Sequence, residues 1–251
     1  MISGAALVAQ RLAEGIASRG HEVLVVAASD RQRAYTNSTA HLRLVRLRSF
    51  PNPVRVDQRF LIWPQREIAA ELQAFRPDVL HLQDSLSAGL SGLLVAHAFD
   101  IPVVLTGHAL PWFVSAYAPA LPSLRQGIEA GLWIYGTWLL RQCEAVITPT
   151  RIIADTVSAH VNCRPQVISY GVDLRRFIPR PVFPGEGETL RQKYGLAPYV
   201  PIILYVGRID VDKRVDLVVR AAENTFRQVD DIGLVYCRLS CILVEHLPLS
   251  F

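Results

Sequence analysis

Lysine is nearly absent from this 251-residue chain, in which only Lys193 and Lys213 accompany the arginines. The net charge of +4 therefore rests on arginine, whose planar group donates paired hydrogen bonds to phosphates and carboxylates. A nucleic-acid surface would need a basic stripe along one face. The one arginine cluster, Arg43, Arg46 and Arg48, is better explained as a solvated strand, so nucleic acid is not an expected partner.

Long apolar runs and paired cysteines are also missing. No uninterrupted apolar stretch reaches the roughly 18 residues of a membrane span, and no signal peptide is recognisable. The four cysteines form neither a disulfide framework nor a pair of C-x-x-C zinc sites, and the spacing of Cys237 and Cys241 suits neighbours on a helix. We expect reduced thiols, no metal and a cytoplasmic location.

Several enzyme signatures are absent as well. No G-x-G-x-x-G stands between a strand and a helix, because "GEGETL" lies in a proline-rich stretch and lacks the last glycine, so a nicotinamide dehydrogenase is disfavoured. The P-loop motif and the G-x-S-x-G motif are also missing, which disfavours P-loop nucleotide hydrolysis and α/β-hydrolase chemistry. With 51% hydrophobic and 19% charged residues, the chain has enough apolar surface to fold, which excludes disorder.

What is present is an alternation of short β-branched runs and longer helical ones, typical of parallel βαβ units. Strands are expected at 21–29, 42–48 (exposed or at an edge), 78–84, 102–108, 145–150, 166–171, 202–210 and 232–237. Helices are expected at 4–18, 66–75, 87–99, 123–142, 151–161 and 215–226. The fold class is therefore α/β, with Rossmann-like domains.

Prolines and glycines between 179 and 201 predict a linker. This gives a first domain at 1–179 and an incomplete second domain at 180–251. Doubly wound sheets open with a central strand before the first helix, so we also expect that the first strand is missing and that the chain is truncated at both ends.

Candidate ligand-binding residues follow the strands, because open α/β sheets bind ligands at the carboxyl ends of their strands. In the first domain these are Gln83, Asp84 and His108, although Asp84 is equally explained as a helix cap and His108 as a structural hydrogen bonder. Gly171 is expected to serve a turn, and Asp173 to act as a cap.

In the second domain the loop "VGRIDVDK" offers Gly207 for close backbone approach, with Arg208 and Lys213 as cations for a diphosphate. The alternative is an ordinary charged loop.

Six segments in order resemble family-4 retaining glycosyltransferases of the GT-B fold. They span roughly residues 3 to 235 and read "SGAALVAQRLAEGIASRGHEVLVV", "RPDVLHLQD", "PVVLTGHA", "AVITPT", "VISYGVDLRRF" and "LYVGRIDVDKRVDL". The resemblance implies two Rossmann-like domains facing a cleft. It also implies a nucleotide-sugar donor held mainly by the second domain and an acceptor held mainly by the first.

Carried over by position, Gly4 corresponds to the glycine-rich loop near the donor, and His108 to the histidine that contacts the donor sugar near the reacting carbon. Arg208 and Lys213 correspond to the pair that neutralises the leaving diphosphate, so neither metal nor cofactor is implied. The E-x7-E glutamates of the family are not in this chain, from which we expect no transfer by these residues alone.

The resulting hypothesis is transfer of a hexose, with retention, from a nucleotide sugar to a lipid or glycan. The stretch "GLWIYGTWLL" between Arg125 and Arg141 favours either a peripheral contact with the inner membrane face or packing against the sheet. The alternatives are an inactive remnant, a nucleotide-binding module, and a nucleotide-sugar 2-epimerase.

Overall fold

The computed structural model divides into two units, Met1–Gly171 and Val172–Phe251. The sequence analysis places this boundary eight residues later, after 179. Residues described by the structure are 4–31, 33–52, 59–108, 110–111, 115, 117, 121–175, 177, 191–192, 195, 202–207, 209, 213–226, 233–238 and 241–245. Most of the expected linker lies outside them.

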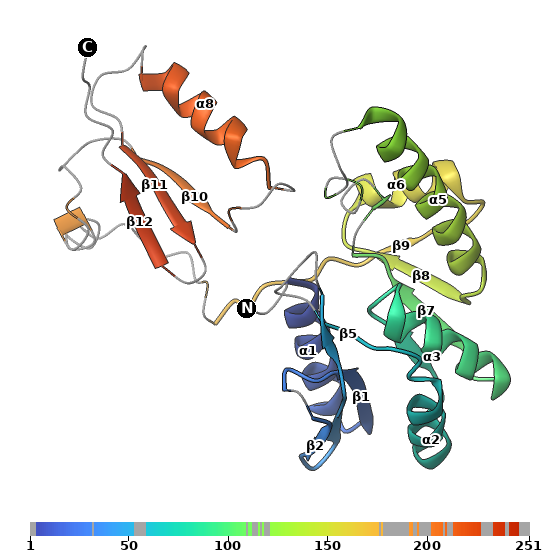
Figure 1. The fold of residues 1–251 in the computed structure, drawn as a ribbon. Helices are drawn as coiled ribbons and strands as arrows, with labels where there is room; N and C mark the ends of the chain where they lie inside the picture. Colours follow the sequence, from blue (N-terminus) through green and yellow to red (C-terminus); the bar gives the residue numbers. More distant parts are fainter. Residues whose placement is uncertain are drawn as a thin grey trace. The chain divides into compact units, whose positions relative to one another are not determined.

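The first unit contains a parallel sheet of four strands in the order β6–β7–β8–β9. Helices connect these strands, because parallel neighbours need long crossovers (Figure 1). The elements are β6 (Leu80–Leu82), α3 (Ser87–Ala98), β7 (Val103–Thr106), α5 (Pro122–Arg141), β8 (Ala145–Thr148), α6 (Arg151–His160) and β9 (Gln166–Val167). All four strands therefore end at the same edge of the sheet.

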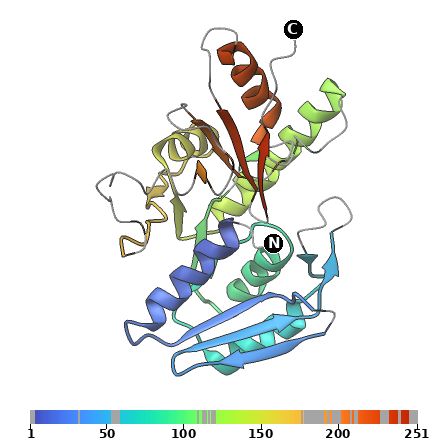
Figure 2. The ribbon, with the colours of Figure 1, turned by 90° about the vertical axis from the view of Figure 1, so that its left-hand side faces the viewer.

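A second sheet of this unit runs in the order β1–β3–β2, and α1 lies along it (Figure 2). Its elements are α1 (Gly4–Ala17), β1 (Val23–Ala28), β2 (Tyr35–Ser38) and β3 (Leu42–Leu47), followed by the short pair β4 (Phe50–Pro51) and β5 (Arg59–Phe60) and by α2 (Gln65–Phe75). Each helix and strand expected in this unit is present, although β9 is shorter than expected and β2, β4 and β5 were not predicted.

The expected exposed or edge position of 42–48 is wrong, because β3 is the central strand of its sheet. Its arginines find partners inside the fold: Arg43 forms an ion pair with Glu71 of α2, and Arg46 donates to the carbonyl of Ala28. Long arginine stems lie along apolar surface while their charged ends reach a partner. The edge strands of this sheet are β1 and β2, and the sequence analysis did not predict β2.

One apolar cluster joins the two sheets. It includes Leu47 of β3, Leu72 of α2 and Val95 of α3, with Val26 of β1 and Leu80 of β6 packed against it.

Among the described strands, β1 pairs with β3 only and β6 with β7 only. None of the six apolar residues of β1 is fully buried. Open strand edges of this kind promote aggregation.

The second unit contains β10 (Ile202–Val206) parallel to β11 (Gly233–Arg238), which pairs antiparallel with β12 (Cys241–Glu245). Helix α8 (Val215–Phe226) packs Ala222 against Ile203 and Tyr205. The helical arrangement expected for Cys237 and Cys241 is wrong: these residues lie on adjacent antiparallel strands. Residues four apart in the sequence can lie near each other on two paired antiparallel strands as well as on a helix, which explains the error.

Gly89 tests the close packing at the start of α3. A Cβ added there would lie 1.6 Å from the backbone oxygen of Asp84. Because this neighbour is backbone, Gly89→Ala should lower the free energy of unfolding by about 3 kcal/mol in urea denaturation. Gly127→Ala on α5, where a Cβ meets nothing within 4 Å, is the control and should be neutral or slightly stabilising. Equal effects of the two substitutions would contradict the packing described.

Candidate functional site

Polar side chains gather at the carboxyl ends of the four parallel strands. Gln83 follows β6 directly, and His108 follows β7 after Gly107. Thr148 is the last residue of β8, and Tyr170 lies three residues beyond β9. The backbone N–H of Gly107 donates to the carbonyl of Ile147, which extends the pairing of β7 with β8 up to the residue before His108.

His108 is held by hydrogen bonds on both sides of its ring. Its Nε2 lies 2.8 Å from Oε1 of Gln83, and its Nδ1 lies 2.6 Å from the hydroxyl of Tyr170. Because β8 lies between β7 and β9, the Tyr170 side chain reaches across the end of a strand to make this contact. The His108 and Tyr170 ring centroids are 5.4 Å apart. The structure therefore brings together Gln83 and His108, as the strand ends predict, and adds Tyr170.

A second histidine, His81, lies on β6 two residues before Gln83. Nε2 of His81 is 2.7 Å from the hydroxyl of Thr106. Burial lowers the pKa of His81, and the nearby His108 lowers it further. Burial also lowers the pKa of His108 and raises that of Tyr170. All three groups are therefore uncharged at neutral pH, and the site offers hydrogen bonds without a net charge.

Two polar atoms of this edge have no hydrogen-bond partner: Nε2 of Gln83 and the hydroxyl of Thr148. Thr148 is fully buried, at 0% exposure. Buried polar groups are normally paired, and leaving one unpaired costs roughly 1–3 kcal/mol. Within the described part of the chain, no group of three or more His, Cys, Asp or Glu side chains could hold a metal ion.

The capping interpretation of Asp84 is confirmed. Its carboxylate accepts hydrogen bonds from the backbone N–H groups of Leu86 and Ala88, each at 3.1 Å, at the start of α3. Gly171 has a φ of 70°, as its expected turn requires. Asp173 accepts a hydrogen bond from the backbone of Arg175 at 3.0 Å, which is the local capping role expected for it.

The sequence analysis missed Tyr170. It took 166–171 as one strand, whereas β9 ends at Val167 and the next residues form an irregular segment. Had the strand been expected to end before Tyr170, this residue would have been a candidate for ligand binding, because residues that follow parallel strands meet at one edge of the sheet.

The predicted donor-binding residues are less fully described. Gly4 is the exposed first residue of α1, with open space around its Cα. Lys213 is exposed just before α8, and Arg208 lies outside the described residues. The neighbouring Arg214 forms two hydrogen bonds with Asp216, at 2.9 and 3.0 Å. The roles of Gly4, Arg208 and Lys213 stay predictions.

Residues 2–176 match the family model of Glycosyltransferase Family 4, which covers well over half of the chain. The chain belongs to this family. It is 26% identical over 240 residues to the alpha-monoglucosyldiacylglycerol synthase of Streptococcus pneumoniae, a match covering 93% of this chain and 52% of that enzyme. It is 31% identical over 157 residues to the D-inositol 3-phosphate glycosyltransferase of Xylanimonas cellulosilytica, covering 61% of this chain and 36% of that one.

Solved structures show the same fold. Sucrose-phosphate synthase from Thermosynechococcus elongatus has a TM-score of 0.66 at 19% identity, over 93% of this chain and 56% of that one. A glycosyltransferase from Rickettsia africae has a TM-score of 0.55 at 15% identity, over 94% and 66%. The GT-B type of α/β fold expected from the sequence is confirmed for this family-4 chain. The chain spans about half the length of the first relatives.

The two half-buried histidines predict how stability depends on pH. Because the pKa values of His81 and His108 are lowered from 6.5 in the folded state, the unfolded chain binds protons first as the pH falls. Their contribution is complete above pH 6.5 and is lost as the pH falls through their folded pKa values. The urea midpoint should therefore decrease between about pH 7.5 and about pH 5.5.

His108→Gln should reduce this decrease, and His21→Gln at an exposed position serves as the control. If His108→Gln kept the full pH dependence of the wild-type chain, the lowered pKa of His108 would be contradicted.

Proposed function

We propose that this family-4 protein transfers a hexose from a nucleotide sugar to a lipid or glycan acceptor, with retention at the anomeric carbon. The observation that carries the proposal is the uncharged cluster of Gln83, His108 and Tyr170 at the strand ends of the family-matched region. Hydroxyl-rich ligands are recognised by many neutral hydrogen bonds. A histidine donor flanked by an amide and a phenol provides such contacts.

Charge handling is assigned to the second unit. Arg208 and Lys213 are proposed to bind the diphosphate, whose negative charge grows as it leaves the sugar. Fixed cations at developing charge stabilise the transition state. In this division of roles His108 contacts the sugar, and the two cations hold the leaving group. The name of the S. pneumoniae relative, a diacylglycerol glycolipid synthase, supports the lipid acceptor.

Transfer is tested in a chimera. Residues 4–171 replace the matching segment of the S. pneumoniae synthase, and the flanking residues of that enzyme are kept on both sides. We expect transfer of labelled hexose from one of a panel of nucleotide sugars, and at least a tenfold loss in His108→Ala, because a sugar contact is removed. Gln10→Ala on exposed α1 is the matched control.

The 251-residue chain is assayed in parallel and should show no transfer. A folded chimera that only epimerises or hydrolyses the donor, or only binds it, would contradict the proposal. Transfer by the chain alone that His108→Ala abolishes would support the proposed function and contradict only the expected inactivity of these 251 residues.

The diphosphate contacts are tested by calorimetry on the chain. Arg208→Ala and Lys213→Ala should each weaken nucleotide-sugar binding about tenfold, because each removes a charge-assisted hydrogen bond. Arg220→Ala on α8 is the control for the loss of one positive charge. Unchanged affinity in both loop variants would overturn their assignment.

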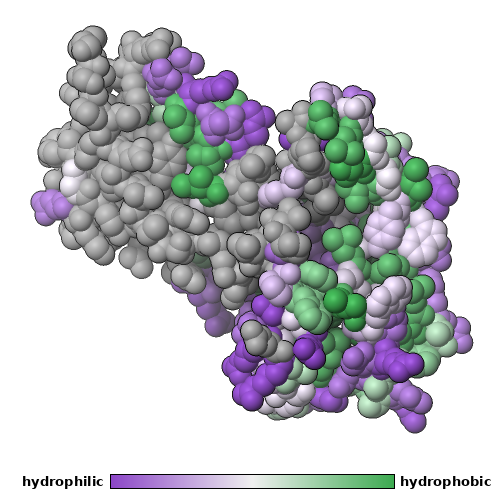
Figure 3. Space-filling view, viewed as in Figure 1, coloured by the Kyte–Doolittle hydropathy of each residue, from purple (hydrophilic) through white to green (hydrophobic). Residues whose placement is uncertain are grey.

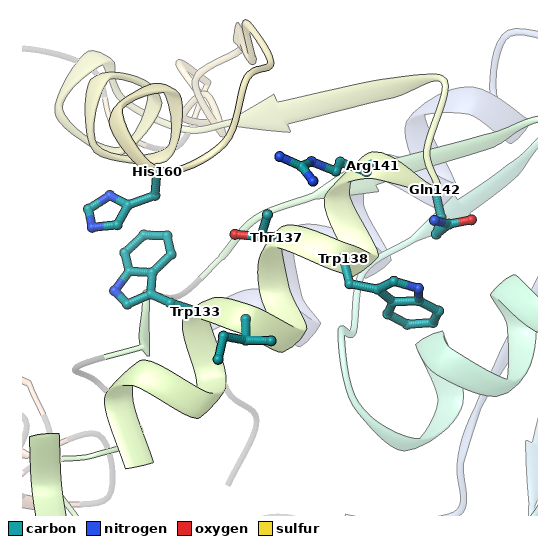
Figure 4. Close-up of a pocket in the computed structure, with 7 residues that line it drawn as sticks. Trp133, Thr137, Trp138, Arg141, Gln142 and His160 are labelled. Carbon is teal, nitrogen blue, oxygen red and sulfur yellow. The ribbon is translucent and has the colours of Figure 1, made fainter. Parts of the chain in front are cut away.

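A membrane contact through α5 is part of the proposal for a lipid acceptor. Figure 3 shows apolar side chains over this helix, and Ile134 and Trp138 are 74% and 42% exposed. A cavity of about 580 Å³ lies beside it, where Trp133 stacks on His160 with ring centroids 3.8 Å apart (Figure 4). Arg141 also lines this cavity. An exposed indole and an exposed isoleucine next to a cation suit an anionic bilayer surface.

No described helix is both long and apolar enough to cross a membrane. The contact that we propose is a peripheral one through the exposed side chains of α5.

Vesicle flotation tests this surface. The chain should float with vesicles containing anionic lipid and remain in solution with neutral ones, and Trp138→Ala should reduce flotation several-fold, because the buried indole area is lost. Trp63→Ala is the matched control, since Trp63 is 80% exposed outside this surface. Equal flotation of both variants would exclude α5 as the contact.

A further inference from the structure

The two contacts of His108 define where its proton lies. A neutral imidazole donates from one nitrogen and accepts at the other. The amide oxygen Oε1 of Gln83 can only accept, so Nε2 of His108 must donate to it. Nδ1 then accepts from the hydroxyl of Tyr170. The hydrogen bonds form a chain in one direction, from Tyr170 through His108 to Gln83.

The reverse direction would need the Gln83 amide turned over, with Nδ1–H of His108 donating to the Tyr170 oxygen. The first direction is favoured chemically, because a phenol O–H is more acidic than the N–H of a neutral imidazole. Desolvation disfavours the charged imidazolium and lowers the pKa of His108, so the ring is neutral in either direction.

We propose that Tyr170 is a positioning residue that fixes His108 in the tautomer protonated at Nε2. With Nδ1 occupied by the Tyr170 hydroxyl, His108 presents a hydrogen-bond donor and does not act as a base. A sugar oxygen then replaces the Gln83 oxygen as the acceptor, a step that rests on the proposed function. The turn at Gly171, with its φ of 70°, directly follows Tyr170 and fixes the backbone beside it.

A neighbouring titratable group is His81, whose pKa is lowered by burial and by His108. Because His81 is also neutral, it places no charge against the His108 ring. Asp84, next to Gln83, directs its carboxylate to the N–H groups of α3. The tautomer of His108 therefore depends on its two direct partners, Tyr170 and Gln83.

Histidine ¹⁵N NMR on the 251-residue chain tests the proposal without donor or acceptor. His108→Gln identifies the His108 signals. The wild-type chain should show His108 protonated at Nε2 and unprotonated at Nδ1. In Tyr170→Phe we expect a mixture of tautomers, and the pKa of His108 should rise toward its ordinary value, because the neutral ring loses a donor to Nδ1.

Tyr135→Phe is the matched control, since the Tyr135 hydroxyl donates to the carbonyl of Ser85 and not to His108. It should leave the His108 signals unchanged. A wild-type ring protonated at Nδ1, or a Tyr170→Phe spectrum identical to wild type in a folded chain, would overturn the proposal.

Failure of the proposed function is distinguishable from failure of this inference. A chimera without transfer would contradict the function and leave the NMR result standing. In an active chimera, Tyr170→Phe should shift the acid limb of the rate profile to higher pH, since His108 would then be protonated at higher pH. A purely structural effect would lower thermal stability without moving that limb.

Discussion

Parallel pairing of β6, β7, β8 and β9 is the constraint on which the rest of the site depends. Parallel strands carry their carboxyl ends to one edge, so residues far apart in the sequence meet there. Gln83, His108 and Tyr170 lie just beyond the ends of three strands and are separated by 25 and 62 residues, yet they form one hydrogen-bonded group. The hydrogen bond from Gly107 to Ile147 keeps β7 in register up to the point where His108 leaves the sheet.

The second property of the site is its lack of charge. Burial keeps His81 and His108 neutral, and the one carboxylate adjoining the cluster in sequence, that of Asp84, caps α3. A neutral site binds hydroxyl groups without attracting phosphates strongly. Phosphate binding then needs positively charged residues elsewhere in this arginine-rich chain. The proposed function assigns this role to Arg208 and Lys213. Sugar recognition and diphosphate stabilisation would thus use different residues of different units.

Sequence reasoning predicted those parts of the fold that local pattern determines. Apolar runs bounded by glycine and proline located β6 and β7, which is why Gln83 and His108 were found at their ends. The cap at Asp84 was foreseeable because its carboxylate precedes a helix. Contacts made across the sheet were not foreseeable: Tyr170 reaches over β8, and Trp133 stacks on His160 from another helix.

The errors have the same origin. Arginines in β3 suggested an exposed or edge strand, because a one-dimensional pattern cannot show that Arg43 reaches Glu71 on another element. The spacing of Cys237 and Cys241 fits a helix and a strand connection equally well. The sequence pattern shows which residues alternate along a strand. The elements that pack against the strand determine whether each side chain is exposed or buried.

The central claim is that the strand ends around His108 bind the sugar of the substrate. The most direct measurement compares ¹⁵N chemical shifts of the chain with a nucleotide sugar and with the same nucleoside diphosphate lacking the sugar. The account predicts that the sugar-bearing ligand alone changes the signals of Gln83, Gly107, His108 and Tyr170. If both ligands gave the same changes there, or if the sugar-dependent changes fell only on the α5 cavity, the claim would be contradicted.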